Sequence, residues 1–110
     1  MRVLLDNNVN RRFANQIRGH EMVSARKMGW QELENGDLIA AAEREGSEVM
    51  VTADKQMQYQ QSLADRKICI IVLNALLVKW PHILPSAPHV QRALDGGVPK
   101  GSFVIINPDR

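Results

Sequence analysis

The sequence predicts a single α/β domain built on a mainly parallel sheet of four to five strands flanked by helices. Short apolar runs alternate with segments of helical periodicity, which is the pattern of βαβ units. The run 68–73 is apolar throughout, as expected for a central strand covered on both faces. A length of 110 residues suits one domain, 1–110, and no repeat or linker divides it.

The amino-terminal part of this domain begins with an expected strand at 2–5. A helix is expected over 9–18, because apolar side chains recur there every four residues, and Gly19 ends it. A short second strand follows at 21–24. Residues 26–35 are expected to form a loop or a distorted helix.

The middle of the chain carries the clearest helix signal, over 37–45, with apolar residues on one face and Gly46 at its end. A third strand is expected at 49–52. The Gln-rich segment 55–64 that follows is expected to be helical.

The carboxyl-terminal part starts from the apolar strand at 68–73. After three prolines, a helix is expected near 87–95, ended by Gly96-Gly97. A final strand at 102–106 completes the sheet, as an edge strand.

Composition narrows the function classes. The net charge of +2 permits an acidic partner such as RNA without demanding one. The one cysteine, Cys69, lies in an apolar run and is expected to be a buried hydrophobe, so no disulfide framework is implied. We see no membrane span and no signal peptide, which makes the cytoplasm the default location.

Two of the expected strands end on an aspartate. Val3-Leu4-Leu5 runs into Asp6, and the strand at 49–52 runs through Ala53 into Asp54. In an open α/β sheet, groups just past the carboxyl ends of the strands meet in the crevice where the strand order reverses. Two carboxylates there repel each other unless a cation or a shared proton intervenes. A site for a hard metal ion is therefore the first hypothesis.

The residues around these aspartates resemble a known family. The opening Leu4-Leu5-Asp6-Asn7-Asn8-Val9 looks like the first motif of PIN-like domains, and the block 37–42 leading to 49–54 looks like the next. The whole chain is similar in length and order to the small PIN-like family labelled DUF5615. This resemblance implies an endoribonuclease dependent on Mg²⁺ or Mn²⁺, acting on single-stranded RNA. It also implies the toxin of a bacterial toxin–antitoxin pair, with a small cognate antitoxin protein as partner.

The same resemblance implies roles for individual residues. Asp6 and Asp54 would be direct metal ligands, Asp37 a direct or water-bridged ligand, and Asn8 a group that orients Asp6 or the substrate. Geometry alone does not place Asp37, because we expect a helix start to lie at the opposite end of the sheet unless the preceding loop crosses over. Glu32 or Glu34 would stand in for the helical glutamate of larger PIN domains.

The chain departs from the family at two acidic positions. Asn7 replaces a glutamate found in many relatives, and Gln56 replaces an acid two residues after Asp54. Each amide keeps an oxygen donor but loses a full negative charge, which weakens the attraction for a divalent ion. The alternative function is therefore a catalytically inactive PIN-like module that binds another protein. An RNA-binding protein without catalysis is a third reading.

Candidate substrate-binding residues surround the expected crevice. Several of Arg11, Arg12, Lys55, Arg26 and Lys27 are expected to rim the crevice and hold phosphates, although for any single one of them a solvated surface position is favoured. Tyr59 can stack on an unpaired base or pack beneath its helix, and packing is slightly favoured.

Structural explanations compete with each proposed role. Asp6, Asp37 and Asp54 each suit the start of a helix, so only their joint pattern favours a shared site. Trp30 and Trp80 are expected to anchor a core or an interface. A homodimer formed through the carboxyl-terminal region, with Trp80 and Phe103, stays open.

Overall fold

The sheet of the computed structural model, which describes residues 1–108, has five strands that all run parallel. The spatial order is β2-β1-β3-β4-β5. The strands are β1 (Arg2–Leu5), β2 (Glu21–Ser24), β3 (Val49–Thr52), β4 (Cys69–Leu73) and β5 (Phe103–Ile106). The predicted α/β fold and its parallel sheet are thereby confirmed, with β5 at an edge.

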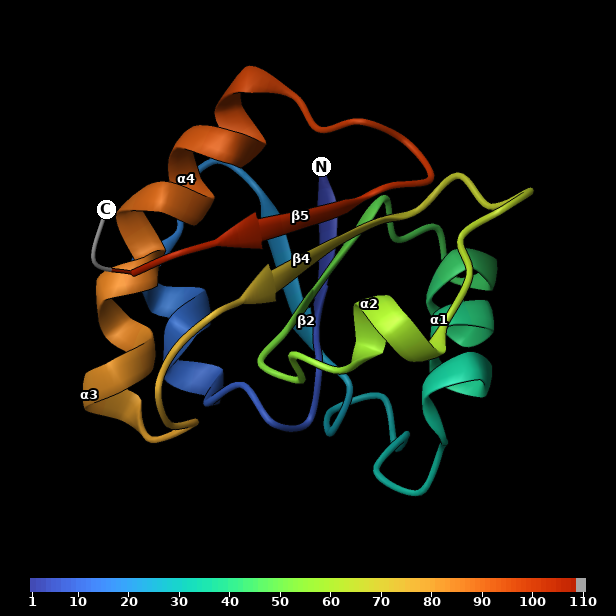
Figure 1. Ribbon diagram of the computed structural model, residues 1–110, viewed down its shortest axis with the longest axis horizontal. Helices are drawn as coiled ribbons and strands as arrows, with labels where there is room; N and C mark the ends of the chain where they lie inside the picture. Colours follow the sequence, from blue (N-terminus) through green and yellow to red (C-terminus); the bar gives the residue numbers. More distant parts are fainter. Residues whose placement is uncertain (109–110) are drawn as a thin grey trace.

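Helices cover both faces of this sheet. Figure 1 shows α3 and α4 on one side of the strands and α1 and α2 on the other. The helices are α1 (Asn35–Arg44), α2 (Met57–Gln60), α3 (Trp80–Ile83) and α4 (Ala87–Gly96), with the 3-10 helices η1 (Arg11–Gln16) and η2 (Leu84–Ser86). None of the helices in residues 1–108 is long and apolar enough to cross a membrane.

Two apolar clusters lie on the two faces. Alternate side chains of β1 point to opposite sides, so Leu5 joins the cluster beneath η1, α3 and α4, and Leu4 joins the one beneath α1. Every residue of β4 is buried, which confirms the expectation of a strand covered on both faces. Together the two clusters make the core of a three-layer sandwich.

Two predicted helices are shorter than expected. The helix predicted at 9–18 is the 3-10 helix η1, because the Val9 amide bonds to the Asp6 carbonyl in a turn and Ile17 is already extended. The helix predicted at 55–64 is the single turn α2, which ends where Gln61 becomes extended. The residues that recur every four in 9–18 are nevertheless buried, so the periodicity correctly indicated the core face.

The helices α3 and η2 were not predicted. The sequence prediction assigned no helix to the first two prolines of this region, yet each of the three lies in the first turn of a helix. A proline there costs no hydrogen bond, because the first amides of a helix have no partner within it. Pro81, Pro85 and Pro88 therefore start α3, η2 and α4 in succession.

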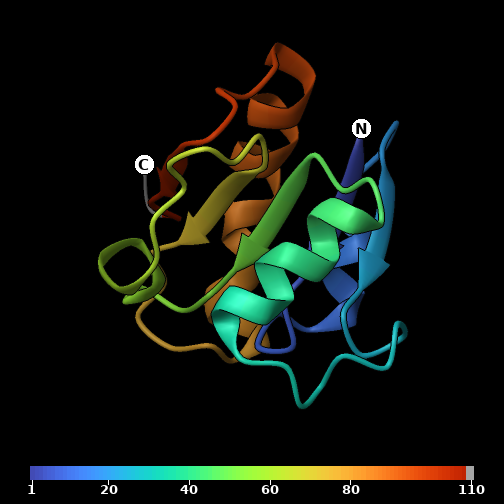
Figure 2. The ribbon, with the colours of Figure 1, turned by 90° about the vertical axis from the view of Figure 1, so that its right-hand side faces the viewer.

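The point that matters for function lies between β1 and β3. The chain leaves β1 for β2 on one side, and later returns to place β3 on the other side of β1. This reversal of strand order creates the crevice in which open α/β sheets bind ligands. Figure 2 shows α1 running against the direction of β3, so that α1 begins near the carboxyl end of the strand. Geometry alone left the place of this helix start open, and the structure puts it at the carboxyl edge, as the family resemblance implies for Asp37.

Candidate acidic site at the carboxyl edge of the sheet

Asp6 and Asp54 meet at the hydroxyl of Thr52, the last residue of β3. This side chain is fully buried. Its Oγ1 donates a hydrogen bond to Asp6 Oδ2 over 2.8 Å and accepts one from the Asp54 backbone amide over 3.0 Å. The two aspartates that end β1 and β3 are therefore connected through one hydroxyl group, at the reversal of strand order.

Asn8 ties the same two strand ends together. Its Oδ1 accepts a hydrogen bond from the Ala53 amide over 3.0 Å, and its Nδ2 donates to Thr52 Oγ1 over 3.4 Å. Asn8 thus lies against the β3 end of the site and touches the hydroxyl that holds Asp6. This position agrees with the expected orienting role, which stays a prediction.

The electrostatics of Asp6 favour a bound cation. Its side chain is only 7% exposed, and this burial raises the pKa of the carboxyl group. The hydrogen bonds from Thr52 and from the Asn7 amide act in the opposite direction, and the neighbouring Asp54 raises the pKa further. A positive ion at this point would offset both the burial and the repulsion between the two acids.

Asp54 is held from two sides. Its Oδ1 accepts a hydrogen bond from the Gln56 amide over 3.0 Å, and its Oδ2 accepts one from Asn35 Nδ2 over 3.1 Å. Asn35 is the first residue of α1, so this contact anchors the helix at the carboxyl edge. The sequence argument missed Asn35 as a residue of the site.

Asp37 lies in the first turn of α1 and is exposed. Since α1 begins at the edge that carries Asp54, the residue is on the expected side of the molecule. Within residues 1–108, however, no group of three or more histidine, cysteine or acidic side chains is gathered as for a metal ion. The structure brings Asp6 and Asp54 together through Thr52 and does not add Asp37 to them. Glu32 and Glu34 are exposed as well.

The donor atoms at this edge fit a hard divalent cation. Asn7 Nδ2 donates to the Trp30 carbonyl over 3.3 Å, and this contact leaves Asn7 Oδ1 buried with no partner among the described residues. Asp6 and Asn7 are consecutive residues at the end of β1, and Asp54 follows the end of the neighbouring strand β3. This edge therefore carries two carboxylates and one unpaired amide oxygen. Mg²⁺ prefers oxygen ligands and keeps several of its waters, so a small set of protein ligands is sufficient.

A cleft of about 960 Å³ opens beside Asp6, over β1 and β2. Arg11 and Arg12 line it, as predicted for residues near the crevice, and Arg26 and Lys27 line it from the loop after β2. The guanidinium of Arg12 also lies over the Trp80 ring, 5.6 Å from its centroid. Basic side chains from two separate segments therefore surround the acidic site on one side.

The other two candidate substrate residues lie outside this cleft. The Lys55 ammonium donates to the Ala75 carbonyl over 3.1 Å, at the ends of β3 and β4. Tyr59 is 76% exposed, so the favoured expectation that it packs beneath its helix was wrong. Its ring is free to stack on a flat partner. Trp30 and Trp80 pack against the two apolar clusters, which agrees with their expected anchoring role.

Comparison with known protein families identifies this fold. A family model described as a PIN like domain matches residues 1–75, a segment that contains β1 to β4 and both aspartates of the site. No curated protein matches the chain significantly. No solved structure does so either.

Proposed function

Because the chain belongs to the PIN-like domain family, we propose that it is an endoribonuclease dependent on Mg²⁺ or Mn²⁺. The observation that carries this proposal is the pair of strand-end aspartates, Asp6 and Asp54, where the strand order reverses: the Thr52 hydroxyl binds the Asp6 carboxylate and the Asp54 backbone amide. As its biological role we propose the toxin of a bacterial toxin–antitoxin pair, which acts on single-stranded RNA in the cytoplasm. A small cognate antitoxin protein would restrain it. Membership of the DUF5615 family stays a prediction.

In this proposal Asp6 and Asp54 hold the metal ion, and Asp37 reaches it directly or through water. The bound ion would supply a metal-activated water and positive charge next to the scissile phosphate. The protein itself positions the two carboxylates. Thr52 fixes the carboxylate of Asp6, Asn8 contacts the Thr52 hydroxyl in turn, and Asn35 fixes the carboxylate of Asp54.

Substrate binding falls to the residues around this edge. Arg11 and Arg12 approach from the cleft, and Lys55 from the β4 side. Cations of this kind position the phosphates of a nucleic acid without reading its sequence. The exposed ring of Tyr59 would stack on an unpaired base, which favours a single strand over a duplex.

The test measures metal binding apart from activity. Titration of Mn²⁺, followed by calorimetry and by electron paramagnetic resonance, should show one site in the wild type. Affinity should fall about tenfold or more in Asp54→Asn, because one of the two nearest charges is lost. Asp95→Asn, which removes an acid on α4, is the matched control and should bind like the wild type. Equal and negligible binding by wild type and Asp54→Asn would refute the metal site.

Cleavage is measured in parallel on a short single-stranded RNA with Mn²⁺ present. Wild type should cleave it, and Asp6→Asn, Asp37→Asn and Asp54→Asn should each lose activity. Retained activity in Asp37→Asn would remove this residue from the proposed site. Growth arrest on expression of the wild type, relieved by Asp54→Asn, tests the toxin role.

The second candidate is a catalytically inactive PIN-like module that binds another protein. Asn7 and Gln56 favour it, because both are amides at positions where the resemblance to PIN-like domains implies an acid. The variant Asn7→Glu/Gln56→Asp restores these charges. Activity that appears only in this double variant would establish that the natural site has lost catalysis. Activity in the wild type would exclude this candidate.

A further inference from the structure

The cleft beside Asp6 concentrates positive charge from two segments that are distant in sequence. Arg11 and Arg12 belong to the start of η1, which follows β1, whereas Arg26 and Lys27 follow β2. Because β2 pairs with β1 in parallel, both segments leave the sheet at the same edge. Four of the 14 basic residues of a chain with a net charge of only +2 therefore share one cleft.

These four cations are available for a ligand. All are exposed, and none forms an ion pair with an acidic residue in the described part of the chain. Some arginines outside the cleft are paired, since Arg2 pairs with Glu21 and Arg66 pairs with Glu43. Uncompensated cations along one concave surface attract an anionic partner more strongly than scattered surface charges do.

The rest of the cleft favours a nucleic acid strand over an acidic protein. Asn10 and Asn15 also line it and are exposed; the Asn10 side-chain oxygen caps η1, which leaves its NH2 group and the whole Asn15 amide to meet base edges and sugars as well as phosphates. Guanidinium groups match phosphate oxygens with paired hydrogen bonds. A flexible single strand can bend toward the nearly buried Asp6, whereas a duplex is stiff over about 150 base pairs.

We propose that this cleft binds the sugar–phosphate backbone of single-stranded RNA on the β2 side of Asp6, with Arg26 and Lys27 as phosphate contacts beside Arg11 and Arg12. This binding needs no divalent metal. It rests on the proposed nuclease function only for the choice of RNA as the ligand. It gives the substrate a defined path, in which the phosphates enter over β1 and β2 and the strand continues past Asp54 toward Tyr59.

The experiment measures equilibrium binding without cleavage. A fluorescein-labelled short oligouridine is titrated with full-length protein in EDTA, and its anisotropy is recorded at several salt concentrations. The cleft variant is Arg26→Gln/Lys27→Gln. The matched control is Arg44→Gln/Lys100→Gln, which removes the same two charges from exposed residues outside the cleft. Circular dichroism and thermal unfolding verify that both variants are folded.

The wild type should bind with an affinity that falls as salt rises. The cleft variant should bind about tenfold more weakly, with a salt slope shallower by about 1.4, or about 0.7 for each lost phosphate contact. The control should stay within about twofold of the wild type. Equal weakening in the two variants, or no binding by the wild type in EDTA, would overturn the proposal.

A competition arm and the cleavage assay separate the possible failures. Polyglutamate of matched charge should compete far less well than unlabelled oligouridine, and equal competition would mean a general anion site and overturn the assignment to RNA. If the wild type binds through the cleft but never cleaves RNA, the nuclease proposal fails and the cleft proposal stands. If RNA is cleaved while Arg26→Gln/Lys27→Gln binds normally, the reverse holds.

Discussion

Thr52 shows how much one hydroxyl group contributes to this site. It donates to Asp6 and accepts from the Asp54 amide, and no solvent reaches it. A buried carboxylate that loses such a partner keeps its desolvation cost without the hydrogen bond that offset it. The geometry of the two acids therefore depends on a residue that is not itself acidic.

We predict that Thr52→Val lowers the free energy of unfolding by about 1–3 kcal/mol. Valine has nearly the same shape as threonine but lacks the hydroxyl, so the substitution leaves the Asp6 oxygen without its hydrogen-bond donor. Urea unfolding at neutral pH, without metal, measures the change. Thr52→Ser keeps the hydroxyl and should retain Mn²⁺ affinity, whereas Thr52→Val should weaken it. Identical Mn²⁺ affinity in both variants would show that the hydroxyl does not position the carboxylates.

At this scale the sequence revealed the acids but not the residues that hold them. Asp6 and Asp54 were predictable because each follows a buried strand, and strand ends have defined places in an α/β sheet. Thr52 and Asn35 were not, because a threonine at a strand end or an asparagine at a helix start is common for local reasons. Their partners lie 46 and 19 residues away in sequence, and only the fold brings them together.

The loop before β5 contains a glycine that no other residue can replace without strain. Gly101 has a φ of +66°, and a Cβ atom there would lie 2.6 Å from the carbonyl oxygen of Arg66. Its own amide bonds to the carbonyls of Lys67 and Ile68, so this backbone cannot easily move away. Gly101 thereby lets the chain approach the start of β4 and sets β5 beside it.

We predict that Gly101→Ala lowers the free energy of unfolding by about 1–3 kcal/mol, from the unfavourable φ together with the backbone clash. Gly96→Ala, at the end of α4 with nothing within 4 Å of the added atom, is the matched control and should change stability by less than about 1 kcal/mol. Urea midpoints compare the two. Equal effects would mean that the close approach at Gly101 is relaxed in solution.

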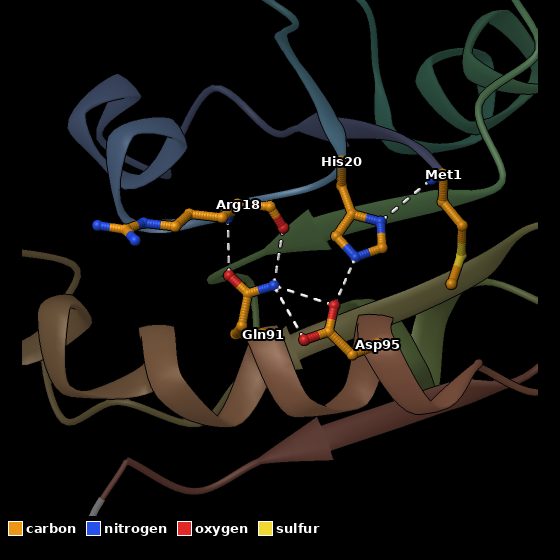
Figure 3. Close-up of polar contacts among 5 residues, drawn as sticks. All are labelled: Met1, Arg18, His20, Gln91 and Asp95. Carbon is orange, nitrogen blue, oxygen red and sulfur yellow. Dashed lines mark hydrogen bonds and ion pairs between the residues drawn. The ribbon is translucent and has the colours of Figure 1, made fainter.

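A polar cluster fastens α4 to the amino-terminal end of the sheet (Figure 3). His20 Nε2 lies 2.9 Å from Asp95 Oδ1, and His20 Nδ1 lies 3.1 Å from the amino group of Met1. Gln91 exchanges two hydrogen bonds with the Arg18 backbone and donates to Asp95. The contacts with His20 and Gln91 lower the pKa of the Asp95 carboxyl group.

The sign of this shift predicts a dependence of stability on pH. Because the pKa of Asp95 is lower in the folded protein than its ordinary 3.8, its stabilisation is present above that value and lost as the pH falls through the folded pKa. Between about pH 6 and about pH 3 the wild type should therefore lose more stability than Asp95→Asn. Urea unfolding across this range measures it. Parallel curves for the two proteins would contradict the assignment.

Prediction from sequence succeeded for the elements whose burial is continuous. The strands were located because runs such as 68–73 are apolar at every position. The extents of η1 and α2 were overestimated because side-chain periodicity does not report the turns at Asp6 and Asp54 that occupy their first residues. The place of the start of α1 was left open, because the path of the loop 25–34 depends on tertiary contacts, such as that between Asn7 and the Trp30 carbonyl.

The two apolar clusters share one sheet, so we expect neither to unfold without the other. Each inner strand contributes side chains to both apolar clusters. The tryptophans lie on opposite faces, with Trp80 against the cluster beneath α4 and Trp30 against the one beneath α1. They are therefore natural reporters for the two halves of the interior.

We predict that both halves unfold in one cooperative transition. Trp30→Phe leaves fluorescence from Trp80 only, and Trp80→Phe leaves that from Trp30 only. In each variant the urea midpoint from fluorescence should coincide with that from circular dichroism. A midpoint that differs between the two probes of one variant would show that one face opens independently of the other.

The order of the strands has a consequence for how the protein is made. β1 leaves the ribosome first but ends in the interior, where Val3 and Leu5 lie beneath residues of α4 such as Val90 and Leu94. Because translation proceeds at about 5–20 residues per second, these apolar side chains stay exposed for several seconds before α4 is translated. Newly synthesised chains are thus expected to engage ribosome-bound chaperones, and messages truncated before α4 should yield products that proteases clear quickly.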